Sequence, residues 1–134
     1  MTIALKYTNI TVNDVDEALG FYRDALGLEV KNDVASGDYR WVTLGSDAQP
    51  GLGIVLSVPH AGRSQSDGDA LQELLTKGLL PLLVFSTDDV DATFETVRAS
   101  GAEVLQEPMD QGWGPRDCAF RDPSGNTVRV AQAA

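Results

Sequence analysis

The sequence predicts an α+β fold made of two tandem copies of one βαβββ module. The first observation is a repeat, because the Asp-Val-Asp at 14–16 returns at 89–91. The second is that a short apolar strand precedes each Asp-Val-Asp. A segment with helically spaced apolar residues follows each Asp-Val-Asp and ends at Gly27 or Gly101. The third is that three more strand-like segments follow each helix. Self-similarity at a fixed spacing sets the architecture of a chain.

The repeat is nearly regular in its spacing. Arg23 and Arg98 are 75 positions apart, as are the two Asp-Val-Asp segments, whereas Gly27 and Gly101 are 74 apart. The second copy has therefore lost one residue between its arginine and its glycine. The glycines stand where a left-handed residue commonly ends a helix.

The first module spans residues 1–59. Alternation places Thr8, Ile10 and Val12 on one face of its first strand, against which the helix packs, and Asp14 can cap that helix. The predicted elements are a strand over 3–12, a helix over about 15–26, a strand over 28–32, a turn at 36–38, a strand over 39–44, a loop rich in Gly and Pro over 45–53, and a strand over 54–58.

Residues 60–78 are interpreted as a linker, with a polar loop over 60–68 and one or two helical turns over 69–77. The second module then spans 79–134 within a single domain of 1–134. Its predicted elements are a strand over 79–87, a helix from Val90 to Gly101, a strand over 103–107, a loop over 108–115, a strand over 116–121, a tight turn over 122–126 and a strand over 127–131.

Composition excludes several classes of partner. The 134 residues carry a net charge of −10, whereas nucleic-acid binding needs a basic face. No apolar run approaches the roughly 20 residues of a membrane span. The single cysteine, Cys118, and the absence of a recognisable secretory signal predict a reducing, cytoplasmic location. A small molecule is the partner that these features leave open.

The ordered motifs identify a family. Val12-x-Asp14 leads to Phe21-Tyr22-x-x-x-Leu26-Gly27-Leu28, then come the Asp-Val-Asp at 89–91 and Gly101, and last the segment Phe120-Arg121-Asp122-Pro123-Ser124-Gly125-Asn126. In this order and duplication the chain resembles the vicinal oxygen chelate superfamily of glyoxalase I, bleomycin-resistance proteins and extradiol dioxygenases. The resemblance implies that the two modules form a partly open barrel, that ligands bind in its concave cavity and that the protein is a homodimer.

The same resemblance implies where a metal would sit. Metal-dependent members use His, Glu or similar residues from the first and last strands of each module, and matching by motif puts Tyr7, Leu56, Leu82 and Arg129 at those positions. Leucine has no donor atom, and arginine stays protonated and would repel a cation. We therefore expect no metal and no other cofactor. The only histidine, His60, is expected on the surface of the linker.

Strand alternation predicts a set of residues for the concave face. The candidate ligand-binding residues are Tyr7, Asn9, Trp41, Leu56, Leu82, Trp113, Asp117 and Arg129. Arg129 can bind a ligand carboxylate or phosphate, or pair internally with Asp117. Asp117 is the one candidate for a general base, with an ion pair as the alternative. Trp113 can be a lid, or it can be a wedge in a core or dimer contact, as can Trp41.

Two functions of different classes follow from this set. The first is a metal-independent protein of the glyoxalase/bleomycin-resistance type that binds an antibiotic or metabolite. The second is a lyase or isomerase of the glyoxalase type that uses Asp117 or Tyr7, or a metal held elsewhere. A third hypothesis is a dimeric interaction module.

Overall fold

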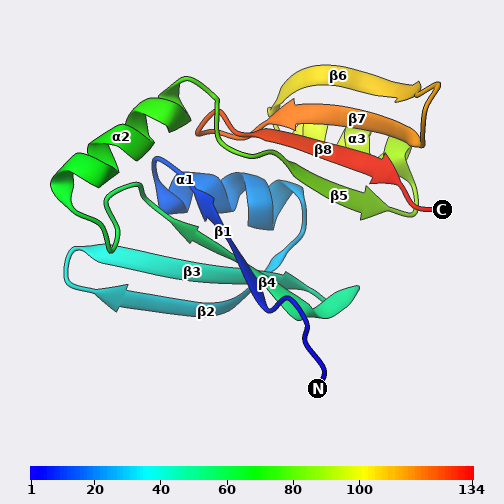
Figure 1. The fold of residues 1–134 in the computed structure, drawn as a ribbon. Helices are drawn as coiled ribbons and strands as arrows, with labels where there is room; N and C mark the ends of the chain where they lie inside the picture. Colours follow the sequence, from blue (N-terminus) through cyan, green and yellow to red (C-terminus); the bar gives the residue numbers. More distant parts are fainter. The chain divides into compact units, whose positions relative to one another are not determined.

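The computed structural model describes all residues, 1–134, and divides into two compact units, Met1–Glu73 and Leu74–Ala134. Each unit contains one four-stranded mixed sheet (Figure 1). The division falls inside the helix α2 (Gln65–Thr76). The predicted α+β class and the order strand, helix, strand, strand, strand in each copy are confirmed.

In the first unit, one helical segment covers one face of the sheet. The strands lie in the order β1-β4-β3-β2, with β1 parallel to β4. The buried side chains that face the helix include Ile10, Val12, Val42 and Leu44, as the alternation predicts. The elements are β1 (Tyr7–Thr11), α1 (Val15–Leu19), its continuation η1 (Gly20–Ala25), β2 (Glu29–Ser36), β3 (Tyr39–Ser46) and β4 (Gln49–Ser57).

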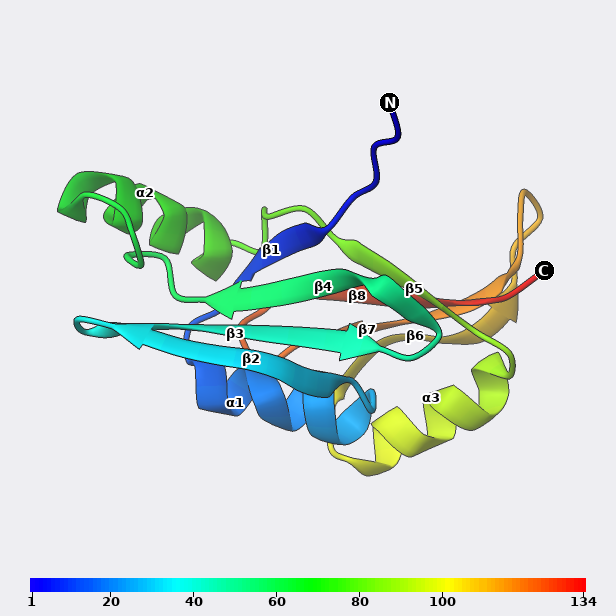
Figure 2. The same ribbon diagram turned by 90° about the horizontal axis from the view of Figure 1, so that it is seen from below.

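The second unit repeats this plan, with α3 on one face of a sheet ordered β5-β8-β7-β6 (Figure 2). Its core contains Val90 and Val97 of the helix, and the rings of Phe94 and Phe120 stack with centroids 5.5 Å apart. The elements are β5 (Leu83–Thr87), α3 (Val90–Ala99), β6 (Glu103–Asp110), β7 (Arg116–Arg121) and β8 (Thr127–Gln132).

The duplicated aspartates begin the two helices. Asp14 accepts a hydrogen bond from the backbone N–H of Glu17 at 2.9 Å, and Asp89 accepts one from Ala92 at 3.1 Å. Each satisfies a helix N–H that has no partner within the helix, and the predicted cap at Asp14 is confirmed.

The one-residue difference between the copies has a structural counterpart in η1. This segment is a π-helical turn, and the N–H of Leu26 donates to the carbonyl of Phe21, five residues earlier. An extra residue inside a helix widens one turn in this way. The turn places the adjacent rings of Phe21 and Tyr22 in the core together, edge to face with centroids 5.0 Å apart. The second copy lacks the residue, and α3 is α-helical throughout.

Each sheet is tied to its helix by one arginine. Arg40 binds Asp16 at 2.7 Å and Asp33 at 2.8 Å. Arg116 binds Asp91 at 2.8 Å and lies 3.6 Å from Asp110. The ion-pair arrangement is therefore duplicated together with the fold.

The two predicted loops are wrong in extent. Most of the predicted loop over 45–53 belongs to β3 and β4, and only residues 47–48 turn between them. Its glycine content has another cause at Gly53, where a Cβ would come within 2.9 Å of the side chains of Thr43 and Tyr7. Likewise β6 continues through Pro108, which the sheet tolerates because β6 is an edge strand.

The linker helix is longer than predicted. It runs over 12 residues as α2, and the Ser64 side chain accepts a hydrogen bond from the N–H of Asp67 at 3.1 Å near its start. This capping contact explains why the polar stretch before Asp69 is helical. No helix of the structure has the length and hydropathy needed to cross a membrane.

Candidate functional site

The face of the second sheet opposite α3 carries a row of unlike side chains. Strand pairing aligns Gln106 of β6, Ala119 of β7, Arg129 of β8 and Val84 of β5 across this face. The next row contains Met109, Asp117 and Ala131. The other face of β7 and β8 carries the buried core side chains, namely Cys118, Phe120, Val128 and Val130. We call the first side the open face.

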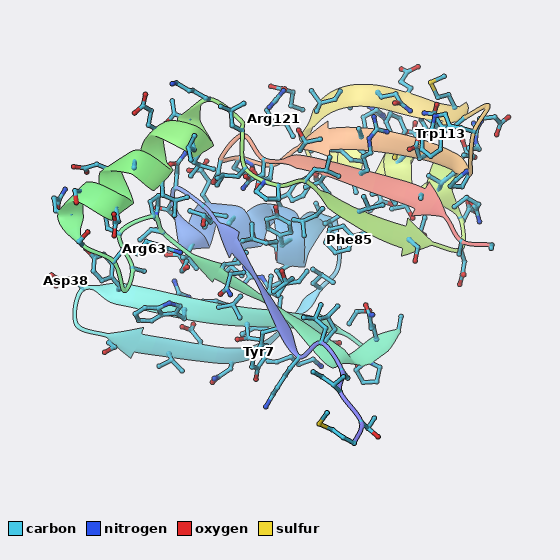
Figure 3. The ribbon with its side chains drawn as sticks, in the orientation of Figure 1. Tyr7, Asp38, Arg63, Phe85, Trp113 and Arg121 are labelled. Carbon is cyan, nitrogen blue, oxygen red and sulfur yellow. The ribbon has the colours of Figure 1, made fainter.

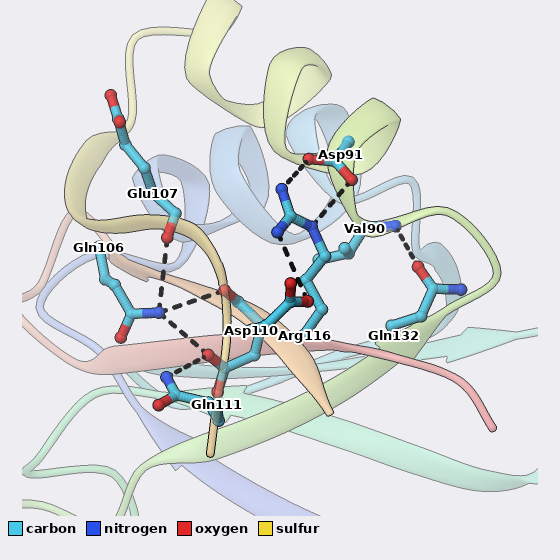
Figure 4. A network of polar contacts seen from close by, with 9 residues as sticks. Val90, Asp91, Gln106, Glu107, Asp110, Gln111, Arg116 and Gln132 are labelled. Carbon is cyan, nitrogen blue, oxygen red and sulfur yellow. Dashed lines mark hydrogen bonds and ion pairs between the residues drawn. The ribbon is translucent and has the colours of Figure 1, made fainter. Parts of the chain in front are cut away.

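A polar cluster of four residues lies on the open face, and it centres on Asp117. Arg129 Nη1 donates to Asp117 Oδ2 at 2.9 Å. Gln106 Nε2 and Gln111 Nε2 donate to Oδ1 at 3.0 and 2.8 Å, and Figure 4 shows these two amides converging. The oxygen of Gln106 accepts from Arg129 Nη1 at 3.3 Å. Both carboxylate oxygens of Asp117 are therefore occupied by donors from the protein itself.

The electrostatics of this cluster keep Asp117 ionised. Burial by itself raises the pKa of Asp117, but the hydrogen bonds from Gln111 and Gln106 and the charge of Arg129 together lower that pKa below its ordinary value of 3.8. A general base that works near neutral pH needs a pKa near neutral. Of the two predicted roles of Asp117, the structure therefore favours the ion-pair partner of Arg129.

Arg129 uses only one nitrogen in this cluster. Its hydrogen bonds to Asp117 and Gln106 both come from Nη1, and the side chain is 33% exposed. No buried side-chain nitrogen or oxygen in the structure lacks a hydrogen-bond partner, so the unbonded Nε and Nη2 of Arg129 are open to solvent. The internal ion pair and an available donor edge coexist in one residue.

Trp113 lies in the turn between β6 and β7, as Figure 3 shows. It is 78% exposed, so it is not a wedge in the core of its own unit. The same turn supplies Gln111, whose amide binds Asp117. The turn that bears Trp113 is thereby tied to the polar cluster. Leu82, which precedes β5, is also exposed.

The predicted residues Tyr7, Asn9 and Trp41 lie in the first unit. Asn9 and Val55 are paired across β1 and β4, and Val55 is paired with Thr43 on the other side. Tyr7 belongs to this same face and is half exposed, while Trp41 is half buried. This face is opposite the helix, as predicted for Tyr7, Asn9 and Trp41.

The prediction that places Leu56 on this face is wrong. Leu56 is paired with Ile10 and Val42 and is completely buried under the helix. The corresponding pairs Asn9–Val55 and Val84–Arg129 show that Val55, one residue earlier, is the counterpart of Arg129. A one-residue offset moves a strand residue to the opposite face, and the irregular Gly and Pro-rich start of β4 concealed that offset.

Gln106 and Gln111 were missed by the sequence reasoning. The pairing of β6 shifts register between Val104 and Gln106 and again before Met109, so simple alternation does not assign the face of Gln106. Gln111 lies in a turn, where alternation gives no information. A usable signal was present, because a buried aspartate in a strand requires more donors than one arginine supplies.

Two remaining polar residues are structural. Cys118 is fully buried, and burial raises the pKa of its thiol to about 11, so it is a core residue. His60 lies 2.8 Å from Asp69 and is only partly exposed. Its ring packs so closely on α2 that a Cβ at Gly68 would lie 2.1 Å from it. His60 is therefore packed against α2 and not simply exposed on the surface, as was expected.

Comparison with protein families matches residues 4–130 to the model described as Glyoxalase/Bleomycin resistance protein/Dioxygenase superfamily. The chain belongs to this family, and the resemblance inferred from its motifs is confirmed.

Two curated relatives extend over nearly the whole chain. The "Uncharacterized protein YurT" of Bacillus subtilis is 30% identical, and the alignment covers 93% of this chain and 95% of the relative. The "Probable lactoylglutathione lyase" of Synechocystis is 25% identical over 97% of this chain and 95% of the relative.

Two solved structures share the fold. UcmS2 superposes with a TM-score of 0.88 at 30% identity and covers 99% of this chain and 100% of its own. TnmS3, described as an antibiotic binding protein from Streptomyces sp. CB03234, has a TM-score of 0.77 at 24% identity, with 100% and 99% covered. At 24% identity, the comparison with TnmS3 establishes only that the two proteins share a fold.

The residues at the family's metal positions do not fit a divalent cation. The resemblance predicts Tyr7 and Leu56 in one unit and Leu82 and Arg129 in the other, and the register of β4 puts Val55 in place of Leu56. Valine and leucine carry no donor, one phenol is insufficient, and the guanidinium of Arg129 is a cation already paired with Asp117. No group of three or more His, Cys, Asp or Glu side chains lies together elsewhere in the structure.

Proposed function

We propose that the chain is a small-molecule binding protein of the glyoxalase/bleomycin-resistance type that takes its ligand on the open face without a metal. The observation that carries this proposal is the polar cluster, in which Asp117, itself bound by two glutamines, holds Arg129 while two nitrogens of Arg129 remain free. A fixed donor beside apolar surface is the usual composition of a ligand site.

The apolar part of the site is exposed. Val84, the strand neighbour of Arg129, is 63% exposed, Met109 opposite Asp117 is 47% exposed, and Trp113 is 78% exposed. Apolar side chains of this size in contact with water gain free energy when a ligand covers them, by about 25 cal/mol per Å². In this proposal Trp113 lies over the ligand. Tyr7, Asn9 and Trp41 are proposed ligand contacts of the first unit's own sheet, considered by itself.

The class of ligand is an antibiotic or a metabolite. The description of TnmS3 as an antibiotic binding protein supports the first, because it shows that this fold serves that purpose in another protein. The support is one of fold only.

A thermal-shift screen tests the proposal. Antibiotics and metabolites are added to the protein in the presence of EDTA, and at least one is expected to raise the Tm. A ligand at one hundred times its Kd stabilises the folded state by about 2.7 kcal/mol. The Val84→Ser variant, which changes only an exposed side chain, is expected to respond less to the same ligand. A screen without any shift would contradict the proposal.

A glyoxalase-type lyase or isomerase is the second candidate, favoured by the names of relatives such as the Synechocystis protein. It predicts turnover of a hemithioacetal that is lost on EDTA treatment or on Asp117→Asn. The lowered pKa of Asp117 and the donor-poor metal positions argue for the binding function instead.

A homodimer in the cytoplasm remains part of the proposal. The alternative is an interaction module whose main role is dimerisation. Sedimentation at several concentrations measures the assembly. Dimerisation alone, with no ligand in the screen, would favour the interaction module.

A further inference from the structure

The arginines of this chain show a consistent preference at one edge of the guanidinium group. There are seven arginines, and in five of them Nε donates to a carboxylate. In four of these five, Nη2 also donates to the same carboxyl group. In Arg23, Arg40 and Arg116 the two nitrogens reach different oxygens, which is the two-pronged contact that suits a planar carboxylate, whereas in Arg98 both reach one oxygen of Glu95. The five are Arg23, Arg40, Arg98, Arg116 and Arg121.

Arg129 and Arg63 are the two exceptions. Arg63, labelled in Figure 3, lies in the loop before α2. Its Nη1 donates to the backbone carbonyls of Pro59 and Ala61. Arg129 donates from Nη1 to Asp117 and Gln106. The difference is that a buried carboxylate orients Arg129 on a sheet face, whereas no carboxylate fixes Arg63.

Arg40 binds two carboxylates with one guanidinium group, whereas Arg129 binds one. The Nη1 of Arg40 donates to Asp16 at 2.7 Å, while Nε and Nη2 donate to Asp33 at 2.9 and 2.8 Å. The side chains of Arg40 and Arg129 are almost equally exposed, 34% and 33%. One guanidinium at this degree of exposure therefore accommodates two carboxylates. The pairing of Arg129 with Asp117 does not exclude a second anion.

We propose that the Nε–Nη2 edge of Arg129 binds the carboxylate of a small-molecule ligand. This inference rests on the proposed function and narrows its ligand class to molecules with a carboxylate attached to an apolar body. The body lies on Val84 and Met109, near the turn that carries Trp113. Asp117, with Gln106 and Gln111, is the positioning group that fixes the edge.

The net charge of −10 does not prevent this contact. Exposed charges farther away than about 8–10 Å are largely screened at physiological salt. The four residues of the cluster contain one cation and one anion, so the local field at the free edge of Arg129 is set by its own N–H groups. Long-range charge slows the approach of an anion more than it weakens the bound state.

NMR of the arginine Nε–H groups tests the inference with two matched probes, 2-naphthoate and 2-naphthamide. The naphthoate is expected to shift the Arg129 Nε–H signal in a saturable manner, and the neutral amide is expected to bind about tenfold more weakly or not to shift it. Arg63 is the internal control, because its Nε is also without a carboxylate, and its signal should stay in place.

Arg129→Lys is the matched variant, because it keeps a cation beside Asp117 but removes the two-pronged edge. It is expected to fold and to lose the preference for naphthoate over naphthamide. Equal binding of the two probes by the native chain, or an equal shift at Arg63, would overturn the inference. So would a silent Arg129 signal at a naphthoate concentration that shifts the backbone signals near Trp113, although that result would leave small-molecule binding intact. No shift anywhere with naphthoate overturns the inference, and the thermal-shift screen then decides the proposed function separately.

Discussion

Asp117 is a carboxylate whose neighbours determine what it can do. It is buried, it accepts from three side chains, and its pKa lies below the ordinary value. Because the pKa is lower in the folded chain than in the unfolded chain, the ionised group contributes stability at neutral pH. That contribution is lost as the pH falls from about 4 through the folded-state pKa.

The Asp117→Asn variant tests this contribution. Its free energy of unfolding at pH 7 is expected to be lower by about 1–3 kcal/mol, since Arg129 loses its charged partner. The deficit is expected to shrink in acid, and urea unfolding at several pH values measures it. Asp110→Asn is the control, because Asp110 is 85% exposed and lies 3.6 Å from Arg116. It should change stability by no more than about 0.5 kcal/mol. A deficit of equal size at every pH would contradict the assignment.

Cys118 provides an independent test at the same scale. With its thiol buried and its pKa raised to about 11, it is expected to resist a thiol reagent such as DTNB in the folded protein at pH 8 and to react at once in denaturant. Rapid labelling without denaturant would place this strand residue outside the core.

At the scale of elements, the π turn η1 absorbs the extra residue of the first module. Deleting exposed Asp24 should convert the turn into an α-helical one and cost about 1 kcal/mol. Deleting exposed Thr96 from α3 should cost at least about 2 kcal/mol, because it rotates buried Val97 away from the core. Chemical denaturation of both deletions measures the difference. An equal loss of unfolding free energy in the two deletions would contradict the view that η1 accommodates an extra residue.

Gly68 in α2 gives a second element-scale prediction. Gly→Ala inside a helix usually stabilises by about 1 kcal/mol. Here a Cβ would lie 2.1 Å from the His60 ring and displace it from Asp69, so Gly68→Ala is expected to lower the Tm. In a His60→Ala background the same change should raise the Tm, which completes a double-mutant cycle. Stabilisation in both backgrounds would contradict the close packing.

The success of the sequence reasoning also differs by element. The helix starts at 15 and 90 and the strand at 116–121 follow from caps and alternation, and the structure confirms them. The sequence pattern predicts β4 and β6 to be shorter than they are, because Pro50 and Pro108 are typical of loops. Both strands contain a register shift, and such irregularities are decided by contacts with neighbouring strands.

For the whole molecule, the duplication is the feature that the sequence reveals best, because the Asp-Val-Asp caps, the helix-ending glycines and the strand order all repeat. Arg129 and Asp117 were predictable from the alternation of regular strands. Gln106, Gln111 and the misplaced Leu56 were not, since their positions depend on a bulge, a turn and a one-residue offset. The candidate site is therefore less visible in the sequence than the fold.

Recognition of a small molecule by Arg129 without a metal ion is the central property proposed for this molecule. The measurement that tests it most directly is calorimetric titration of metal-stripped protein with a compound from the thermal-shift screen, before and after addition of Zn²⁺ or Ni²⁺. The account predicts the same Kd in both titrations and about tenfold weaker binding by Arg129→Lys. Binding that disappears from the stripped protein and returns with the metal would contradict it.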